Sequence, residues 1–223
     1  MIERIRAWAR RHTDDGRYSP VGVGFHWIMA FLVLFQMAWG FSLAFWPAGG
    51  DKLDAYVLHA AAGMPVLLLA LARGLWRLLI PGPYNDADTQ GVQTLIAHGL
   101  HYLFYAAFLV MPISGWVMWS ALVAPGTLSF AGLAGWPVLP LDGLPLTTRW
   151  AIMDGARAVH GWAAWTLAII VPLHVIAALK HHFWDRHDVL RGMLPDIPDA
   201  RGRPAGTRHT PPAPPAPSAS AAR

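Results

Sequence analysis

Four long apolar runs constrain this chain more than any other feature of its sequence. They cover about residues 21–46, 56–80, 94–123 and 156–184. Each run has at least the roughly 20 residues that an α-helix needs to cross a hydrocarbon core of roughly 30 Å. The runs therefore predict an all-α fold, an integral membrane four-helix bundle.

The composition agrees with a surface that faces lipid. Only 13% of the residues are charged, whereas soluble domains average about 25%. The chain also has 12 tryptophans, and amphipathic indole rings gather at the membrane–water boundary. The first run is too long for the apolar part of a signal peptide and no A-x-A-like site follows it, so we expect a retained span.

The remaining sequence divides the chain into three parts. Residues 1–20 are basic and are expected to form a short amphipathic helix on the membrane surface. Residues 21–195 form the transmembrane domain, in which the Gly-, Pro- and Leu-rich connection 124–155 is predicted to cover one end of the bundle as a lid. Residues 196–223 are rich in Pro and Ala, which predicts a disordered C-terminal tail.

Basic residues are distributed unequally over the two ends of the predicted bundle. One end has only Lys52, Arg149 and Arg157. The end that holds both termini has Arg4, Arg6, Arg10, Arg11, Arg17, Arg73, Arg77, Lys180, Arg186, Arg191, Arg201, Arg203 and Arg208. The positive-inside rule therefore places both termini in the cytoplasm, and spans one and three run outward. This placement accounts for the net charge of +4 without a nucleic-acid partner.

Histidine is the ionisable residue that recurs within the spans. Because the chain has no cysteine, disulfides, thiolate-ligated iron–sulfur clusters and C-x-x-C-H haem attachment are excluded, and His is the strongest ligand left for a redox cofactor. An ionisable side chain inside a span is costly and indicates function by default. Six lie in the spans or at their ends: His26, His59, His98, His101, His160 and His174. Three more stand at the exit of span four, at the expected level of the lipid headgroups: His181, His182 and His187.

Depth in the membrane groups four of these histidines into two pairs. His160 and His174 are 14 residues apart, which is about 21 Å along a helix and nearly four whole turns, so both share one face. His160 then lies near the outer side and His174 near the inner side. His26 comes early in outward-running span one, and His59 comes early in inward-running span two. The predicted pairs are His26 with His174 and His59 with His160.

Two facing imidazoles at each level are suited to holding a haem iron inside a helical bundle. Nearby glycines would let a flat macrocycle approach the backbone, although small residues also serve helix packing. Arg73 lies 14 residues after His59, and Arg157 lies one turn before His160. We expect these two arginines to contact the propionates of the inner and the outer haem. An arginine near a helix end, such as Arg73, can instead extend to the headgroups.

His98 and His101 stand near the cytoplasmic boundary, where an imidazole costs little. Two interpretations remain open for them. They are interfacial residues, or they form a quinone site beside the inner haem, where an imidazole would bind a carbonyl oxygen or pass a proton.

Seven motifs between residues 17 and 195, in their order along the chain, resemble those of a known family. This family is the bacterial cytochrome b561 family, which is related to the cytochrome b subunits of nickel–iron hydrogenases. The resemblance rests on R-Y-S-P-V-G-V-G-F-H-W (17–27), L-H-A-A-A-G-M (58–64), L-A-R-G-L-W-R-L (71–78), A-H-G-L-H (97–101), M-P-I-S-G-W (111–116), V-H-G-W (159–162) and L-H-V-I-A-A-L-K-H-H-F-W-D-R-H-D-V-L-R-G-M-L-P (173–195).

The resemblance implies four helices and two b-type haems, with His26, His59, His160 and His174 as the iron ligands. Similar family members exchange electrons with membrane quinones, and at least one oxidises superoxide at the outer face. The chain departs from the family pattern at Gly161, where an acidic residue is common after the ligand. This departure leaves haem binding intact and puts a proton or substrate role of that carboxylate in doubt.

The leading hypothesis is an oxidoreductase that passes electrons between an outer donor and the quinone pool of the respiratory chain. Two iron centres without an open coordination position suit electron transfer. The donor would be superoxide, which Lys52, Arg149 and Arg157 would attract, or a periplasmic redox protein. One alternative is a cytochrome b anchor subunit of a hydrogenase or dehydrogenase. Another is a haem-free transporter whose histidines bind a metal ion or relay protons.

Overall fold

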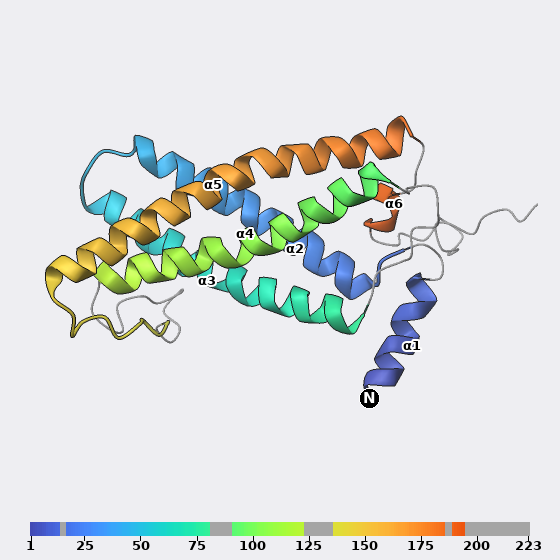
Figure 1. The fold of residues 1–223 in the computed structure, drawn as a ribbon, viewed down its shortest axis with the longest axis horizontal. Coiled ribbons are helices and arrows are strands. Elements are labelled where there is room, and N and C mark those ends of the chain that lie inside the picture. Colours follow the sequence, from blue (N-terminus) through green and yellow to red (C-terminus); the bar gives the residue numbers. More distant parts are fainter. Residues whose placement is uncertain (14–16, 81–90, 123–135, 186–188, 195–223) are drawn as a thin grey trace, which may run out of the picture. The chain divides into compact units, whose positions relative to one another are not determined.

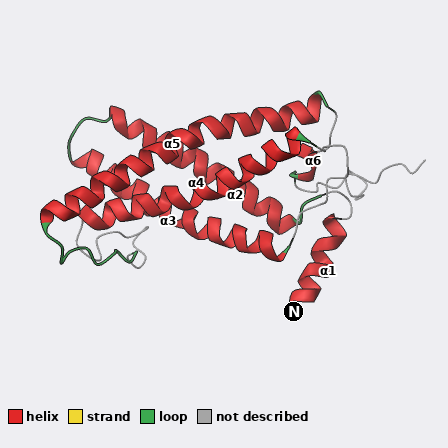
Figure 2. Cartoon of the chain, in the orientation of Figure 1, coloured by secondary structure: helices red, strands yellow, loops and turns green. Residues whose placement is uncertain are grey.

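The computed structural model describes residues 1–13, 17–80, 91–122, 136–185 and 189–194. In these residues all regular secondary structure is helical (Figure 2). Four helices are long and apolar enough to cross a membrane. They are α2 (Pro20–Ser42, continued by the 3₁₀ helix η1, Leu43–Phe45), α3 (Gly50–Leu79), α4 (Val92–Leu122) and α5 (Leu146–Phe183). The predicted all-α bundle of four membrane-spanning helices is confirmed.

Two of the helices begin earlier than the sequence predicted. Helix α3 begins at Gly50 rather than at about residue 56, and α5 begins at Leu146 rather than at about residue 156. The added turns of α5 contain Arg149 and Asp154. Charged residues lower the hydropathy of a segment without preventing helix formation, so the apolar run marks the membrane-buried part of a helix and not its start.

The four long helices run in alternating directions, as Figure 1 shows. Helix α3 packs against α2 and α4, and α4 packs against α5. One end of the bundle therefore holds the start of α2 and the end of α5, and we call it the terminal end. The opposite end holds the connections from α2 to α3 and from α4 to α5, and we call it the loop end.

Helix α2 begins at a hydrogen-bonded cap at the terminal end. The hydroxyl of Ser19 accepts a hydrogen bond from the backbone N–H of Gly22 at 3.3 Å, and Pro20 occupies the first helical position. Both features favour a helix N-terminus, since proline has no N–H to leave unpaired there. The indole of Trp76 in α3 also donates to the Ser19 hydroxyl at 3.2 Å. The cap thus ties the start of α2 to α3.

The surface of the bundle has the polarity expected for contact with lipid. Small residues such as Ala61, Ala107 and Ala163 are buried between the helices, as is typical of membrane helices that pack closely. Large apolar side chains point outward, among them Phe31, Trp162, Trp165, Ile169 and Ile176. Monomeric soluble proteins rarely expose an apolar surface of this extent, which is typical of contact with a membrane or a partner protein.

The described part of the α4–α5 connection packs against the loop end. The indole of Trp116 donates to the carbonyl of Pro137 at 2.7 Å, and the N–H of Leu139 donates to the Ser120 hydroxyl at 3.0 Å. Trp136 and Val138 pack on a buried cluster of Ala61 and Trp119. Residues 136–139 therefore pack on this end of α3 and α4, as expected of a lid. Residues 124–135 of the predicted lid lie outside the described residues, and its residues 146–155 belong to α5.

The N-terminal residues form helix α1 (Ile2–Thr13), as the sequence predicted. Ala9 is buried, and the Arg6 guanidinium donates to the carbonyl of Leu79 at the end of α3. Ile2 is exposed. At the other terminus, the short helix α6 (Val189–Gly192) follows α5, and the carbonyl of Gly192 accepts a hydrogen bond from the N–H of Tyr18. The predicted disordered tail, residues 196–223, lies outside the described residues.

Candidate functional site

The structure brings four histidines together as two pairs inside the bundle. The ring centres of His26 (α2) and His174 (α5) are 6.2 Å apart, and those of His59 (α3) and His160 (α5) are also 6.2 Å apart. These are the partners that depth assigned in the sequence. All four side chains are half-buried. One pair lies toward the terminal end and the other toward the loop end, and we call these positions the terminal level and the loop level.

A spacing of 14 residues repeats in all four long helices. It joins His26 to Gly40 in α2 and His59 to Arg73 in α3, and it also joins His101 to Gly115 and His160 to His174. Fourteen residues are about 21 Å of helix and bring both positions to nearly the same face. In α3 and α5 this spacing joins residues that the sequence analysis singled out. In α2 and α4 the same spacing is the sequence signal that marks Gly40 and Gly115.

The two glycines give the histidines of the loop level their space. A Cβ atom added at Gly40 would lie 2.9 Å from Cε1 of His59, and one added at Gly115 would lie 3.2 Å from Cε1 of His160. Both distances are shorter than ordinary van der Waals contact. Each imidazole therefore lies directly against the backbone of a neighbouring helix, and a side chain in place of either glycine would require the imidazole to shift.

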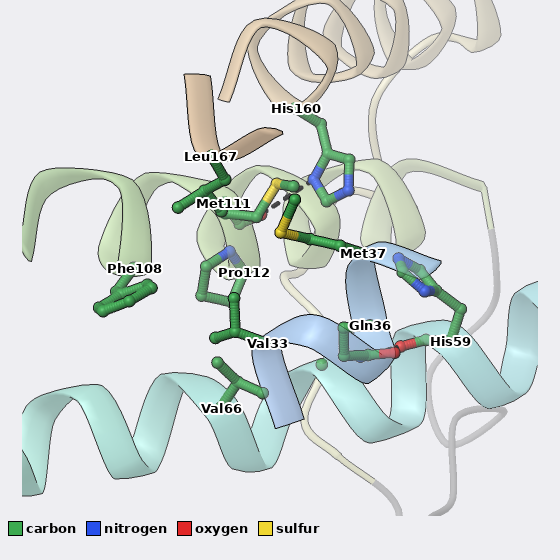
Figure 3. A pocket seen from close by; sticks show the side chains of 11 residues that line it. Val33, Gln36, Met37, His59, Val66, Phe108, Met111, Pro112, His160 and Leu167 are labelled. Atoms are coloured by element: carbon green, nitrogen blue, oxygen red, sulfur yellow. Dashed lines mark hydrogen bonds between the residues drawn. The ribbon is translucent and has the colours of Figure 1, made fainter. Parts of the chain in front are cut away.

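A cavity lies next to the loop-level pair. His59 and His160 border it, and its other lining side chains are mainly apolar, including Met37, Phe108 and Met111. Figure 3 shows the two imidazoles at one end of this space, with Met37 reaching into it from α2. The Nδ1 atom of His59 is buried without a hydrogen-bond partner among the described residues. An apolar space with a few polar groups at its edge is typical of a ligand or cofactor site.

The distance within each pair fits two axial ligands of one metal ion. If each nitrogen lies about 2.0–2.1 Å from the metal, and each ring centre is roughly 1.2 Å further, the two centres are roughly 6.4 Å apart. In the described residues no three His, Cys, Asp or Glu side chains converge on a common point. Two imidazoles per level therefore match a metal whose remaining ligands come from a macrocycle, as in a haem.

The terminal level contains charged and polar groups that the loop level lacks. Nη2 of Arg73 lies 3.4 Å from Nδ1 of His26. The ring of His101 in α4 lies 6.2 Å from that of His174, edge to face. Ring distance alone thus permits either His26 or His101 to face His174, but His101 is exposed and His26 is half-buried. His98, which lies one turn before His101 in α4, is also exposed.

The other singled-out cations are engaged by nearby groups. Arg157 forms an ion pair with Asp154 at 3.1 Å, and its side chain is 68% exposed. An exposed pair of this kind contributes little free energy, so contact between Arg157 and a propionate stays a prediction. Lys52 and Arg149 donate to the backbone carbonyls of Trp46 and Ala121. Arg149 thus links the start of α5 to the end of α4, and Lys52 links the start of α3 to the residue after η1.

Three further histidines stand at or beyond the end of α5 in the sequence. His181 and Lys180 both contact the carboxylate of Asp185 at 2.7 Å. The Lys180 hydrogen bond, with that of His181, lowers the pKa of Asp185 below its ordinary value. His182 has a buried Nδ1 without a partner among the described residues, and His187 lies outside them. None of these contacts involves a histidine of the terminal-level or loop-level pair.

Four membrane-spanning helices with a histidine pair at each of two levels are typical of a multi-pass membrane cytochrome b. Comparison with known proteins gives the same class. The model of the prokaryotic cytochrome b561 family matches residues 17–196, and the chain belongs to this family. It is therefore a bacterial membrane cytochrome b of a haem b-binding family that functions in electron transfer.

Two curated relatives match over most of their length. Cytochrome b561 homolog 2 of Escherichia coli (strain K12) is 30% identical over 181 residues, which are 80% of this chain and 91% of the relative. The probable superoxide oxidase CybB of Yersinia pestis is 26% identical over 181 residues, which are 80% of this chain and 96% of the relative. The family predicted from the motifs is confirmed.

Proposed function

We propose that this cytochrome holds two haem b groups and passes electrons through them across the membrane to or from quinone. The observation that carries the proposal is the pair of histidine contacts, each with ring centres 6.2 Å apart, at two levels of one bundle. His26 and His174 would hold the terminal-level haem, and His59 and His160 the loop-level haem. When bound, each haem supplies one-electron exchange at its iron.

The surrounding residues would bind and orient the two groups. Gly40 and Gly115 leave room for the imidazoles of the loop level. Arg73 stands at the terminal level, where its guanidinium would pair with a propionate, and Arg157 would do so at the loop end. Two imidazoles would hold each haem, and a haem held by two histidines is suited to electron transfer and not to binding oxygen.

The positive-inside rule supports an orientation in which the terminal end faces the cytoplasm. The loop level then lies near the outer face. The name of the Yersinia pestis relative, a probable superoxide oxidase, makes superoxide the first donor to test. Two superoxide anions would each lose one electron to become two molecules of O₂, and a quinone would take up these two electrons and two protons to become a quinol.

The quinone would bind at the terminal level, beside His101. The imidazole of His101 lies against His174 and is exposed at the bundle surface, where lipid and quinone can reach it. Its N–H can donate to a quinone carbonyl, and its ring can carry a proton. His98, one turn nearer the terminal end, would extend this path toward the cytoplasm.

The test starts with purified protein from cells with an ample haem supply. The proposal predicts two haem b per chain, a b-type α band after reduction, rapid reduction by superoxide, and reoxidation by a quinone analogue. Colourless protein would overturn the haem assignment. Two haems with no reaction with superoxide would exclude that donor alone. Stoichiometric purification with a catalytic subunit would instead indicate the anchor function.

A further inference from the structure

Two polar groups of helix α4 contact the imidazole of His160, one of the two loop-level histidines. Nδ1 of His160 lies 2.9 Å from the carbonyl oxygen of Met111 and 3.1 Å from the hydroxyl of Ser114. The Ser114 hydroxyl lies 2.8 Å from the same Met111 oxygen, to which it donates. Ser114 is 5% exposed. These three polar groups therefore form a closed, water-shielded triangle beside the cavity.

The chemistry of the triangle decides where the proton of His160 lies. A carbonyl oxygen can only accept a hydrogen bond, so Nδ1 of His160 must carry the hydrogen between them. Ser114 uses its one hydrogen for the Met111 carbonyl and presents a lone pair to the same Nδ1–H. Nε2 of His160 is then unprotonated, and its lone pair is free to bind a metal ion.

Among the described residues, Nδ1 of His59 and Nδ1 of His26 have no such acceptor. Nδ1 of His59 is buried without a partner among the described residues. Nδ1 of His26 faces the guanidinium of Arg73, which can only donate. A serine that donates to a carbonyl three residues earlier is not unusual in itself, since Ser42 does so to Trp39 at 2.7 Å in α2. What distinguishes Ser114 is the imidazole in contact with it.

We propose that Ser114 is a positioning residue that, with the Met111 carbonyl, fixes the tautomer and the ring orientation of His160. The inference rests on the proposed function in that His160 is a haem ligand. Acceptors on Nδ1–H make an imidazole a stronger electron donor to the metal, and this stabilises the oxidised iron. Ser114 therefore lowers the reduction potential of the loop-level haem.

The first test compares Ser114→Ala with the control Ser42→Ala in the full-length, haem-loaded protein. Ser42→Ala removes an equivalent hydroxyl that touches no histidine. The loop-level centre is identified as the one lost in His160→Ala. In Ser114→Ala we expect the potential of this centre to rise and its low-spin ferric electron paramagnetic resonance signal to shift, while the other centre keeps both values. Ser42→Ala should leave both centres unchanged.

A second pair of variants keeps the shape constant. Ser114→Thr retains the hydroxyl and Ser114→Val replaces it with a methyl group, so the two differ in hydrogen bonding at nearly equal volume. The threonine variant should keep the wild-type potential and signal, and the valine variant should behave as the alanine variant.

Two results would overturn the inference. One is an unchanged loop-level centre in both Ser114→Ala and Ser114→Val. The other is an equal change at both centres, or in Ser42→Ala, which would indicate a general structural effect. Failure of the proposed function is distinguishable, because the wild-type protein would then contain fewer than two haems before any comparison of variants.

Discussion

The loop level and the terminal level each contain a pair of histidines, but the surroundings of the two pairs differ. At the loop level, His59 and His160 lie against glycines, a backbone carbonyl and an apolar cavity. At the terminal level, the Arg73 guanidinium stands next to His26, and His101 adds a further imidazole. A fixed positive charge favours the reduced iron, whereas a carbonyl on the ligand favours the oxidised iron. The comparison predicts a higher potential at the terminal level and electron flow from the loop level toward it.

The largest expected effect tests whether the two levels are separate. His59→Ala or His160→Ala should remove the loop-level haem alone, and His26→Ala or His174→Ala the terminal-level haem alone, because an iron with one axial imidazole is held poorly. Haem content and the reduced-minus-oxidised spectrum measure this. Equal loss of both haems in every variant, in protein that remains folded, would contradict the pairing.

Gly40 tests the close approach at the loop level. Gly40→Ala places a methyl group 2.9 Å from the present position of His59 Cε1. Overpacking of this kind costs about 1–3 kcal/mol, so we expect much reduced occupancy of the loop-level haem and normal occupancy of the other. Haem titration of the two spectral components measures it. The control is Gly24→Ala in the same helix, since a Cβ there meets no atom within 4 Å.

His101 tests whether ring distance or depth selects the partner of His174. His101→Gln should retain both haems and both potentials, since His26 remains as the ligand. Reoxidation by a quinone analogue should slow by up to roughly tenfold, which corresponds to the loss of one hydrogen bond. Stopped-flow spectroscopy separates this step from reduction by superoxide, which should be unchanged. Loss of the terminal-level haem in this variant, but not in His26→Ala, would reverse the assignment.

Arg73 tests the charge difference between the levels. Arg73→Gln should lower the reduction potential of the terminal-level haem, because a nearby positive charge is removed. We expect reduction to become less favourable by on the order of 1 kcal/mol. Redox titration measures both centres. Arg77→Gln serves as the control, since the Arg77 guanidinium lies over the Tyr18 ring, 5.6 Å from its centre. An equal fall in both variants would show that Arg73 acts only through the general surface charge.

Much of the fold and of the histidine pairing could be predicted from the sequence because both depend on position along the membrane normal. Apolar length determines which segments span, and the helical rise converts residue number into depth. His160 and His174 could therefore be placed on one face at two levels, with His59 and His26 as partners. The start of α5 at Leu146 could not be predicted, because hydropathy reports burial in lipid and not the extent of a helix.

By itself, the sequence determined four spans, a family and the depth of each histidine, all of which are properties of single helices. The tertiary structure decided which backbone two of the imidazoles touch, that the Arg73 guanidinium stands next to His26, and that Ser114 and the Met111 carbonyl meet His160. These contacts depend on the rotation and spacing of neighbouring helices, which side-chain packing sets to within an ångström. A pattern along one chain cannot resolve differences that small.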